Sequence, residues 1–237
     1  MDTLPKATSI DEAARAAKVA VLPVGSFEQH GRHLPSATDT MIACAIAEAI
    51  ASQYDLMLLP PIAIACSHEH AAFAGTVSIS AVTLHALITD IAASLEAQGI
   101  HKLVLVNGHG GNYVLGNVVQ EANVGGAKMA LFPHRDDWDR ARKAAGLVTS
   151  AHEDMHGGEL ETSIMLAAAP ESVRHGFEDQ DWIASDRTHL HLAGIQAYTS
   201  SGIVGRPSLA TEAKGKAALD ELVRAFRGHL RLLVAAD

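Results

Sequence analysis

The chain has 237 residues, of which 48% are hydrophobic and only 4% aromatic, and its formal net charge is −9 with histidine counted as neutral. A chain of this length and apolar content can bury one sizeable core, so we expect residues 1–237 to form a single α/β domain. Nucleic acids and anionic membranes bind clustered lysine and arginine, so the negative charge argues against both as the main partner. A small-molecule substrate fits this composition better.

No stretch of the sequence reaches the roughly 20 apolar residues that a membrane-spanning helix needs, and residues 1–6 lack the basic and then apolar build of a signal peptide. We therefore expect a soluble, cytoplasmic protein. The two cysteines, Cys44 and Cys66, lie in apolar surroundings without Cys-x-x-Cys spacing. This pattern predicts buried free thiols rather than a disulfide or a zinc–thiolate site.

Short β-branched runs alternate along the chain with helical stretches rich in alanine and leucine, a pattern typical of parallel strands joined by helical crossovers. The expected strands are 19–24, 56–64, 102–107 and 128–132, and the expected helices are 40–53, 82–98, 112–122, 159–168 and 211–234. Two of these strands are almost wholly apolar, which indicates helices on both faces of the sheet. The prediction is a three-layer αβα sandwich with a mostly parallel central sheet.

Two of the expected strands end in polar, glycine-containing loops, at 25–31 and 107–112. Ligands of open parallel sheets bind in the crevice at the carboxyl ends of the strands, so both loops lie where a site is expected. This arrangement would bring His30 and His109 close together. The segment 178–201 is predicted to be an irregular excursion that forms a pocket wall or a subunit contact.

The first group of candidate ligands is Glu28, His30 and Asp39. Residues two apart in an extended loop point to the same side, so Glu28 and His30 can reach one site. Asp39 is expected at the start of a helix, where a carboxylate is favoured. A purely structural role is open for each of them, because Asp39 can cap a helix and His30 can hydrogen-bond within its loop.

The second candidate, His109, is flanked by glycines that let the backbone approach a ligand and leave N–H groups free for a developing oxyanion. The alternative is a tight strand-to-helix turn with Asn112 as the N-cap. The third group follows His156, where Glu159 and Glu161 fall in the first turn of a predicted helix. The helix dipole stabilises carboxylates there, so both have a structural explanation, whereas His156 does not.

Together these groups offer a mixed set of oxygen and nitrogen ligands that suits Zn²⁺ or Mn²⁺ better than a soft metal. A carboxylate shared between two ions is typical of dinuclear hydrolases, and Asp39 is the candidate for that bridge.

The motifs in this order resemble the creatininase family of metal-dependent amidohydrolases. The matching stretches are 23–35 with 38–40, 69–70 with 73–76, 107–112, 156–163 and a Gly-Ile-Val-Gly run at 202–205. The resemblance implies a creatininase-like fold and homo-oligomers, often hexamers.

The resemblance also implies two divalent metal ions, most simply zinc, with manganese and iron as alternatives. One ion would be held by Glu28, Asp39 and His109, and the other by His30, Asp39 and a further glutamate. Creatininase takes that glutamate from the position of Gly111 in this chain. Other members carry it in the later His-Gly-Gly-Glu motif, so Glu159 is the expected ligand here.

In the resemblance, His156 matches the residue that donates a proton to the leaving nitrogen. The mechanism that we expect for such a centre adds two further roles: His70 would line the substrate pocket, and the N–H group of Gly110 or Gly111 would help to hold the oxyanion. Glu161 is expected to orient a ligand from outside the first coordination sphere. The expected reaction is hydrolysis of an amide C–N bond, in a cyclic amide, a formamide or a similar small substrate, by a hydroxide that bridges the metals.

Two alternatives stay open at this point. Gly111 makes the chain less similar to true creatininases and more similar to members that include a formamidopyrimidine deformylase and the peptidase that matures the mycofactocin precursor. The only two tryptophans, Trp138 and Trp182, do not align with a pair that would line a creatinine-sized pocket. A peptidase of the mycofactocin-maturation type is therefore the first alternative. The second is a non-catalytic metal-binding protein, whose closed site would have no open coordination position.

Overall fold

The computed structural model describes residues 3–235, which fold around a four-stranded parallel sheet with the strand order β2-β1-β3-β4. The strands are β1 (Val19–Val24), β2 (Met57–Leu58), β3 (Lys102–Asn107) and β4 (Met129–Phe132). β1 and β3 pair along their whole length, from Val19 opposite Lys102 to Val24 opposite Asn107. Their carboxyl ends therefore lie side by side at one edge of the sheet.

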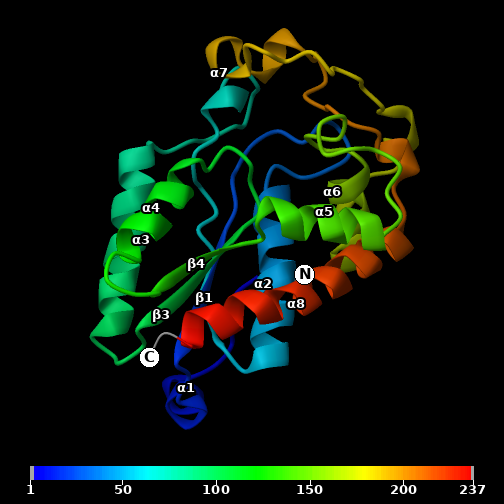
Figure 1. The fold of residues 1–237 in the computed structure, drawn as a ribbon. Helices are drawn as coiled ribbons and strands as arrows, with labels where there is room; N and C mark the ends of the chain where they lie inside the picture. Colours follow the sequence, from blue (N-terminus) through cyan, green and yellow to red (C-terminus); the bar gives the residue numbers. More distant parts are fainter. Residues whose placement is uncertain (1–2, 236–237) are drawn as a thin grey trace.

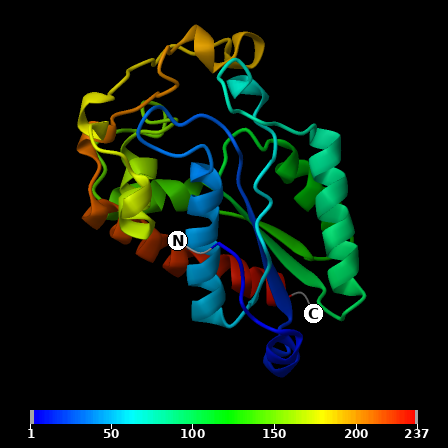
Figure 2. The ribbon, with the colours of Figure 1, turned by 180° about the vertical axis from the view of Figure 1, so that it is seen from behind.

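Alternate residues of β1 enter two separate cores, one on each face of the sheet. Val19 and Val21 pack with α2 (Thr38–Tyr54), α5 (Arg135–Ala144), α6 (Glu159–Ala168) and α8 (Glu212–Val234). Ala20, Leu22 and Val24 pack with α3 (Ala81–Glu96) and α4 (Val114–Ala122). Figures 1 and 2 show the sheet between these two helical layers. The predicted three-layer αβα sandwich is confirmed.

The strand expected over 56–64 is much shorter in the structure, because β2 ends at Leu58. Pro60 and Pro61 interrupt it, since proline has no N–H to donate to the neighbouring strand. Pairing with the end of β1 resumes briefly at Ile62, whose N–H donates to the Pro23 carbonyl over 2.9 Å. The prediction was wrong for the second half of this strand.

All five predicted helices are present with ends shifted by no more than two residues, but α1 (Ser9–Arg15) and α5 were not predicted. The sequence of α5 is strongly charged, so it lacks the apolar periodicity on which the prediction depended. Its start is fixed by Asp137, whose carboxylate accepts the His134 N–H over 2.8 Å.

The segment 178–201 is mostly irregular, as expected, and its helices are at most four residues long. It includes the end of η3 (Phe177–Asp179), α7 (Leu190–Ala193) and η4 (Ile195–Ala197). Figure 1 places α7 beyond the carboxyl ends of the strands, and α7 contacts η1 (His68–His70) there. The remaining 3-10 turns are η2 (Pro170–Ser172) and η5 (Pro207–Leu209). Within residues 3–235 no helix is both long and apolar enough to cross a bilayer.

Candidate metal centre

The start of α2 lies against the ends of both β1 and β3, and two glycines make this approach possible. A Cβ atom on Gly25 would lie 2.3 Å from Thr40 Cα, and one on Gly108 would lie 2.2 Å from the Asp39 carbonyl oxygen. Any side chain at either position would push the helix away from the sheet. The two glycines therefore bring Asp39, in the first turn of α2, between the two loops that follow the strands.

Three sets of side chains place their donor atoms close enough to hold a metal ion, with all donor atoms of a set within 4.8 Å of one another. The sets are Glu28, Asp39 and His109; His30, Asp39 and Glu161; and Glu28, His30 and His156.

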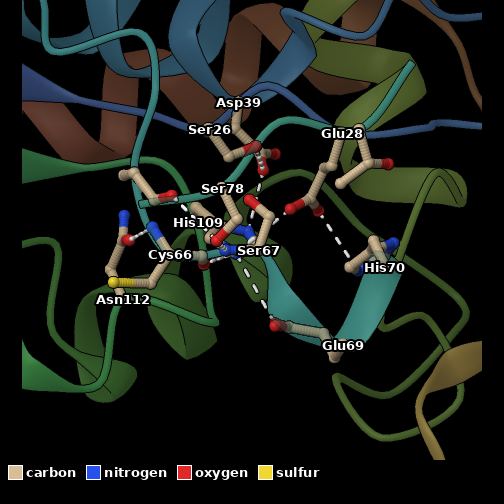
Figure 3. A network of polar contacts seen from close by, with 12 residues as sticks. Ser26, Glu28, Asp39, Cys66, Ser67, Glu69, His70, Ser78, His109 and Asn112 are labelled. Atoms are coloured by element: carbon tan, nitrogen blue, oxygen red, sulfur yellow. Dashed lines mark hydrogen bonds and ion pairs between the residues drawn. The ribbon is translucent and has the colours of Figure 1, made fainter. Parts of the chain in front are cut away.

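Asp39 connects the first two of these sets. Its Oδ1 lies 3.1 Å from His30 Nε2, and its Oδ2 lies 2.9 Å from His109 Nδ1. The Ser26 hydroxyl donates to Oδ2 over 2.7 Å and fixes the carboxylate plane (Figure 3). One oxygen thus faces each histidine, which is the arrangement that a carboxylate bridging two ions requires.

The environment of Glu28 shows that these residues fit a cation. The Glu28 side chain is fully buried, and neither of its oxygens has a hydrogen bond of normal geometry to any residue that the structure describes. The nearest basic groups are His70 Nε2 and His109 Nε2, each 3.2 Å away. A buried carboxylate without a hydrogen bond of normal geometry is strongly unfavourable, and a bound metal ion would provide the missing interaction.

The electrostatics of the centre point the same way. Burial raises the pKa of Glu28 to about 8. Burial alone would lower the pKa of His30, but the neighbouring Asp39 outweighs it and raises the pKa of His30 to about 10. Burial is likewise outweighed at His109, where Glu28 and Asp39 raise the pKa to about 9. In the absence of metal the Asp39 carboxylate lies between two cationic imidazoles, so the centre stabilises positive charge.

The glutamate in the second set is Glu161 and not the expected Glu159. Glu161 Oε2 lies 4.0 Å from His30 Nε2, accepts the Gly157 N–H over 2.5 Å, and has a pKa that burial raises to about 7. Glu159 turns to the opposite side and bonds to Thr149 and to the ammonium of Lys214, which lies 2.6 Å away. Residues two apart on an α-helix point about 200° apart, so only one of the two glutamates can face the centre.

His70 and His156 form one wall of the centre. Their ring centroids are 4.4 Å apart, and His70 Nε2 and His156 Nδ1 lie 3.2 Å and 3.6 Å from Glu28 Oε1. Burial lowers the pKa of His70 to about 3 and holds the pKa of His156 well below its usual value. Both side chains are therefore neutral imidazoles at physiological pH.

Two cavities flank the glycine-rich loop after β3. The smaller, of about 310 Å³, is lined by residues that include His109, Gly110 and Glu161. The larger, of about 480 Å³, is lined by Glu69, Gly111 and the segment 190–194. Gly110 and residues 190–194 of the segment 178–201 thus each line a cavity, and their roles toward a substrate stay predictions.

Glu69 was not singled out from the sequence, although it points toward His109 in Figure 3, with 3.6 Å between Oε1 and His109 Nε2. A Cβ atom on Gly111 would lie only 2.1 Å from Glu69 Oε1, so the carboxylate of Glu69 fills the space that a side chain at 111 would need. The backbone carbonyl of Cys66 lies 2.9 Å from the same histidine nitrogen. Both cysteines are buried and free, as predicted.

The fold and the donor set together define a class: an α/β protein with a candidate metal centre of carboxylates and imidazoles at the carboxyl edge of a parallel sheet. The model of one family, Creatininase, described as creatinine amidohydrolase, matches residues 6–230 of this chain. The chain therefore belongs to the creatininase family of metal-dependent amidohydrolases.

Individual relatives agree with this assignment. A mycofactocin precursor peptide peptidase of Mycobacterium ulcerans is 36% identical over 216 residues, which cover 86% of this chain and 80% of that protein. A creatinine amidohydrolase of Pseudomonas putida is 28% identical over 65% of this chain and 66% of its own length. Two solved structures share the fold. A manganese creatininase is 24% identical, covers 95% of this chain and 96% of its own, and superposes with a TM-score of 0.79. A zinc–zinc creatininase variant is 22% identical, covers 98% of each chain, and superposes with a TM-score of 0.80.

Proposed function

We propose that this protein hydrolyses an amide C–N bond at a dinuclear metal centre. One divalent ion would be held by Glu28, Asp39 and His109, and the other by His30, Asp39 and Glu161. The observation that carries the proposal is the Asp39 carboxylate, which offers one oxygen to each histidine at 3.1 and 2.9 Å. When bound, the two ions supply an activated water and polarise the substrate carbonyl. Zinc suits this donor set best, and manganese and iron are accepted by it.

The chain's own residues perform the remaining steps. His156 lies at the centre as a buried neutral imidazole and transfers a proton to the leaving nitrogen, a step that typically contributes about 10²- to 10⁴-fold to a rate. Gly110 lines the smaller cavity without a side chain, so its backbone can approach the substrate oxygen closely.

The substrate class that we favour is a peptide or a peptide-like amide. Cavities lie on both sides of the glycine-rich loop, about 310 and 480 Å³ in volume, which leaves room for a chain that extends in both directions from the cleaved bond. The relative named as a mycofactocin precursor peptide peptidase supports the same class. The second candidate is a small cyclic amide, which the smaller cavity alone can hold and which the creatinine amidohydrolase relative supports.

The test uses metal-stripped protein that is reloaded with Zn²⁺ or Mn²⁺ and incubated with mixed peptides, formamides, lactams and creatinine, with mass spectrometry of the products. We expect two ions per chain and metal-dependent cleavage of peptides. Turnover of lactams or creatinine alone would favour the second candidate, and two ions without any turnover would favour a metal-binding protein. In His156→Ala we expect unchanged metal content with most turnover lost, and full activity of that variant would exclude its role.

We further propose that the chain forms a homo-oligomer. Large apolar side chains that are strongly exposed in the single chain support this, among them Leu192 and Val82, with exposed fractions of 87% and 79%. Light scattering on the purified protein tests it, and a monodisperse monomer would contradict it.

A further inference from the structure

Gln29 is buried between the two ligands Glu28 and His30, and two backbone groups of opposite polarity orient its side-chain amide. The Gly31 N–H donates to Gln29 Oε1 over 2.9 Å, and Gln29 Nε2 donates to the Gly202 carbonyl over 3.1 Å. A backbone N–H can only donate and a carbonyl can only accept. The orientation of this amide is therefore fixed without reference to any titratable group.

The second hydrogen of Gln29 Nε2 is directed to His70 Nδ1, at 3.0 Å. Because an amide nitrogen only donates, Nδ1 must accept with its lone pair, and the single hydrogen of the neutral imidazole is on Nε2. His70 Nε2 faces Glu28 Oε1 at 3.2 Å. His70 therefore presents an N–H donor to the metal centre and has no lone pair there to bind a metal.

The backbone carbonyl of the same glutamine determines which ring nitrogen of His156 carries the hydrogen. His156 Nε2 lies 2.6 Å from the Gln29 carbonyl oxygen, which can only accept, so the hydrogen of His156 is on Nε2. Its lone pair is on Nδ1, which faces Glu28 Oε1 at 3.6 Å. The two imidazoles, whose centroids are 4.4 Å apart, thus present opposite hydrogen-bonding groups toward Glu28 Oε1: His70 presents a donor and His156 presents an acceptor.

We propose that Gln29 is a positioning residue that gives these two histidines opposite hydrogen-bond polarity, with His70 as a fixed donor and His156 as the proton acceptor. The proposal rests on the proposed amide hydrolysis. His156 Nδ1 takes one proton from the attacking water as the C–O bond forms. It returns that proton to the nitrogen as the C–N bond breaks, so its lone pair is restored. The His70 N–H meanwhile donates to the oxygen of the substrate carbonyl and remains unchanged through the cycle.

The test compares Gln29→Glu and Gln29→Met with the wild-type protein by solid-state ¹⁵N NMR of ring-labelled histidine, which does not depend on molecular size. His70→Gln and His156→Gln assign the two signals. We expect wild-type His70 and His156 both to carry hydrogen on Nε2. In Gln29→Glu, whose carboxylate only accepts, Nδ1 of His70 should gain a proton while His156 stays unchanged, because its partner is a backbone carbonyl. In Gln29→Met, which has no donor, His70 should show both tautomers.

The matched control is Asn123→Asp, the same amide-to-carboxylate change at a distant site. Asn123 Oδ1 accepts the N–H groups of Lys128 and Met129, and its Nδ2 donates to the Met129 carbonyl over 2.8 Å, so it bridges backbone groups as Gln29 does. This variant should leave both histidine signals and turnover unaltered. Gln29→Glu should bind the same amount of metal as wild type, with kcat lowered about a hundredfold.

A wild-type His70 with its hydrogen on Nδ1, or a His70 signal that Gln29→Glu and Gln29→Met both leave unchanged, would overturn the proposal. The tautomer measurement needs no substrate. If the protein cleaves no amide, the proposed function fails while the polarity set by Gln29 can still be confirmed or excluded.

Discussion

The first turn of α6 has two faces that use the same residue type for different purposes. On the face toward α8, burial alone would raise the pKa of Glu159, but Lys214 and the amides of Val148 and Thr149 hold it below its ordinary value. On the face toward His30 in the loop after β1, Glu161 accepts one backbone N–H, and burial raises its pKa to about 7. A carboxylate with all its hydrogen bonds filled supports the fold, whereas one left incomplete is available to a ligand.

The largest effect is expected when Glu161, the carboxylate with unfilled hydrogen-bonding capacity, is replaced. Glu161→Gln should lose one of two metal ions and more than about a hundredfold in turnover, since changing even an outer partner of a metal ligand typically costs about 10- to 100-fold. Metal content by atomic emission and turnover of the identified substrate measure this. Glu159→Gln is the matched control on the other face and should keep both ions. Equal metal loss in the two variants would remove the distinction between the faces.

The pH dependence of metal binding tests the same comparison. The raised pKa values of His30 and His109, about 10 and about 9, mean that both hold a proton at pH 7 when no metal is present. Binding must displace these protons, so affinity rises with pH and falls as pH is lowered, by about tenfold per pH unit for each proton displaced. Chelator competition at pH 6, 7 and 8 measures the slope. Glu159→Gln should leave the slope unaltered, and a pH-independent affinity in the wild type would contradict the expectation.

The sequence alone was sufficient to predict the layers of the fold and four of the five metal ligands now proposed. Continuous apolar runs identify the central strands, and parallel strands bring Glu28, His30, Asp39 and His109 to one edge whatever the details of the loops. These predictions depend on topology, which tolerates errors of a residue or two.

The choice between Glu159 and Glu161 depends on something finer, the rotation of α6 about its own axis. That rotation is set by packing and by Asp154, which is buried against Arg142 and accepts the N–H groups of Glu159 and Leu160 at the start of the helix. No local pattern states which face of a first turn meets the sheet. Gln29 and Glu69 were missed for a similar reason, since their roles come from partners 40 or more residues away.

A stability measurement also distinguishes the two faces of α6, because here the Glu159 face should show the larger effect. Glu159→Ala removes the partner of Lys214 and of three donors on Val148 and Thr149, and should lower the free energy of unfolding by about 3 kcal/mol, as for other broken buried pairs. Metal content should remain at two ions. Lys214→Met should cost less, because the backbone N–H groups still hold Glu159. Urea unfolding of the metal-free proteins gives both values, and a Glu159→Ala variant as stable as wild type would show that this face is not structural.

The smallest effect concerns a third contact of the same turn, between Thr162 Oγ1 and His33 Nε2 at 3.0 Å. Burial lowers the pKa of His33 to about 4, from its ordinary 6.5. Between these values the unfolded chain binds a proton that the folded chain does not, so stability falls as pH falls through this window, by about 2 kcal/mol at pH 5.

His33→Gln keeps a side chain that can hydrogen-bond to Thr162 but cannot titrate, so it should lose about 2 kcal/mol less than wild type between pH 7 and pH 5. Urea unfolding of the metal-free proteins at the two pH values measures the difference. His85→Gln, at a half-buried histidine of α3 that is paired with Glu121 of α4, is the control and should follow the wild type. If His33→Gln also follows the wild type, the buried imidazole is not what links α6 to pH.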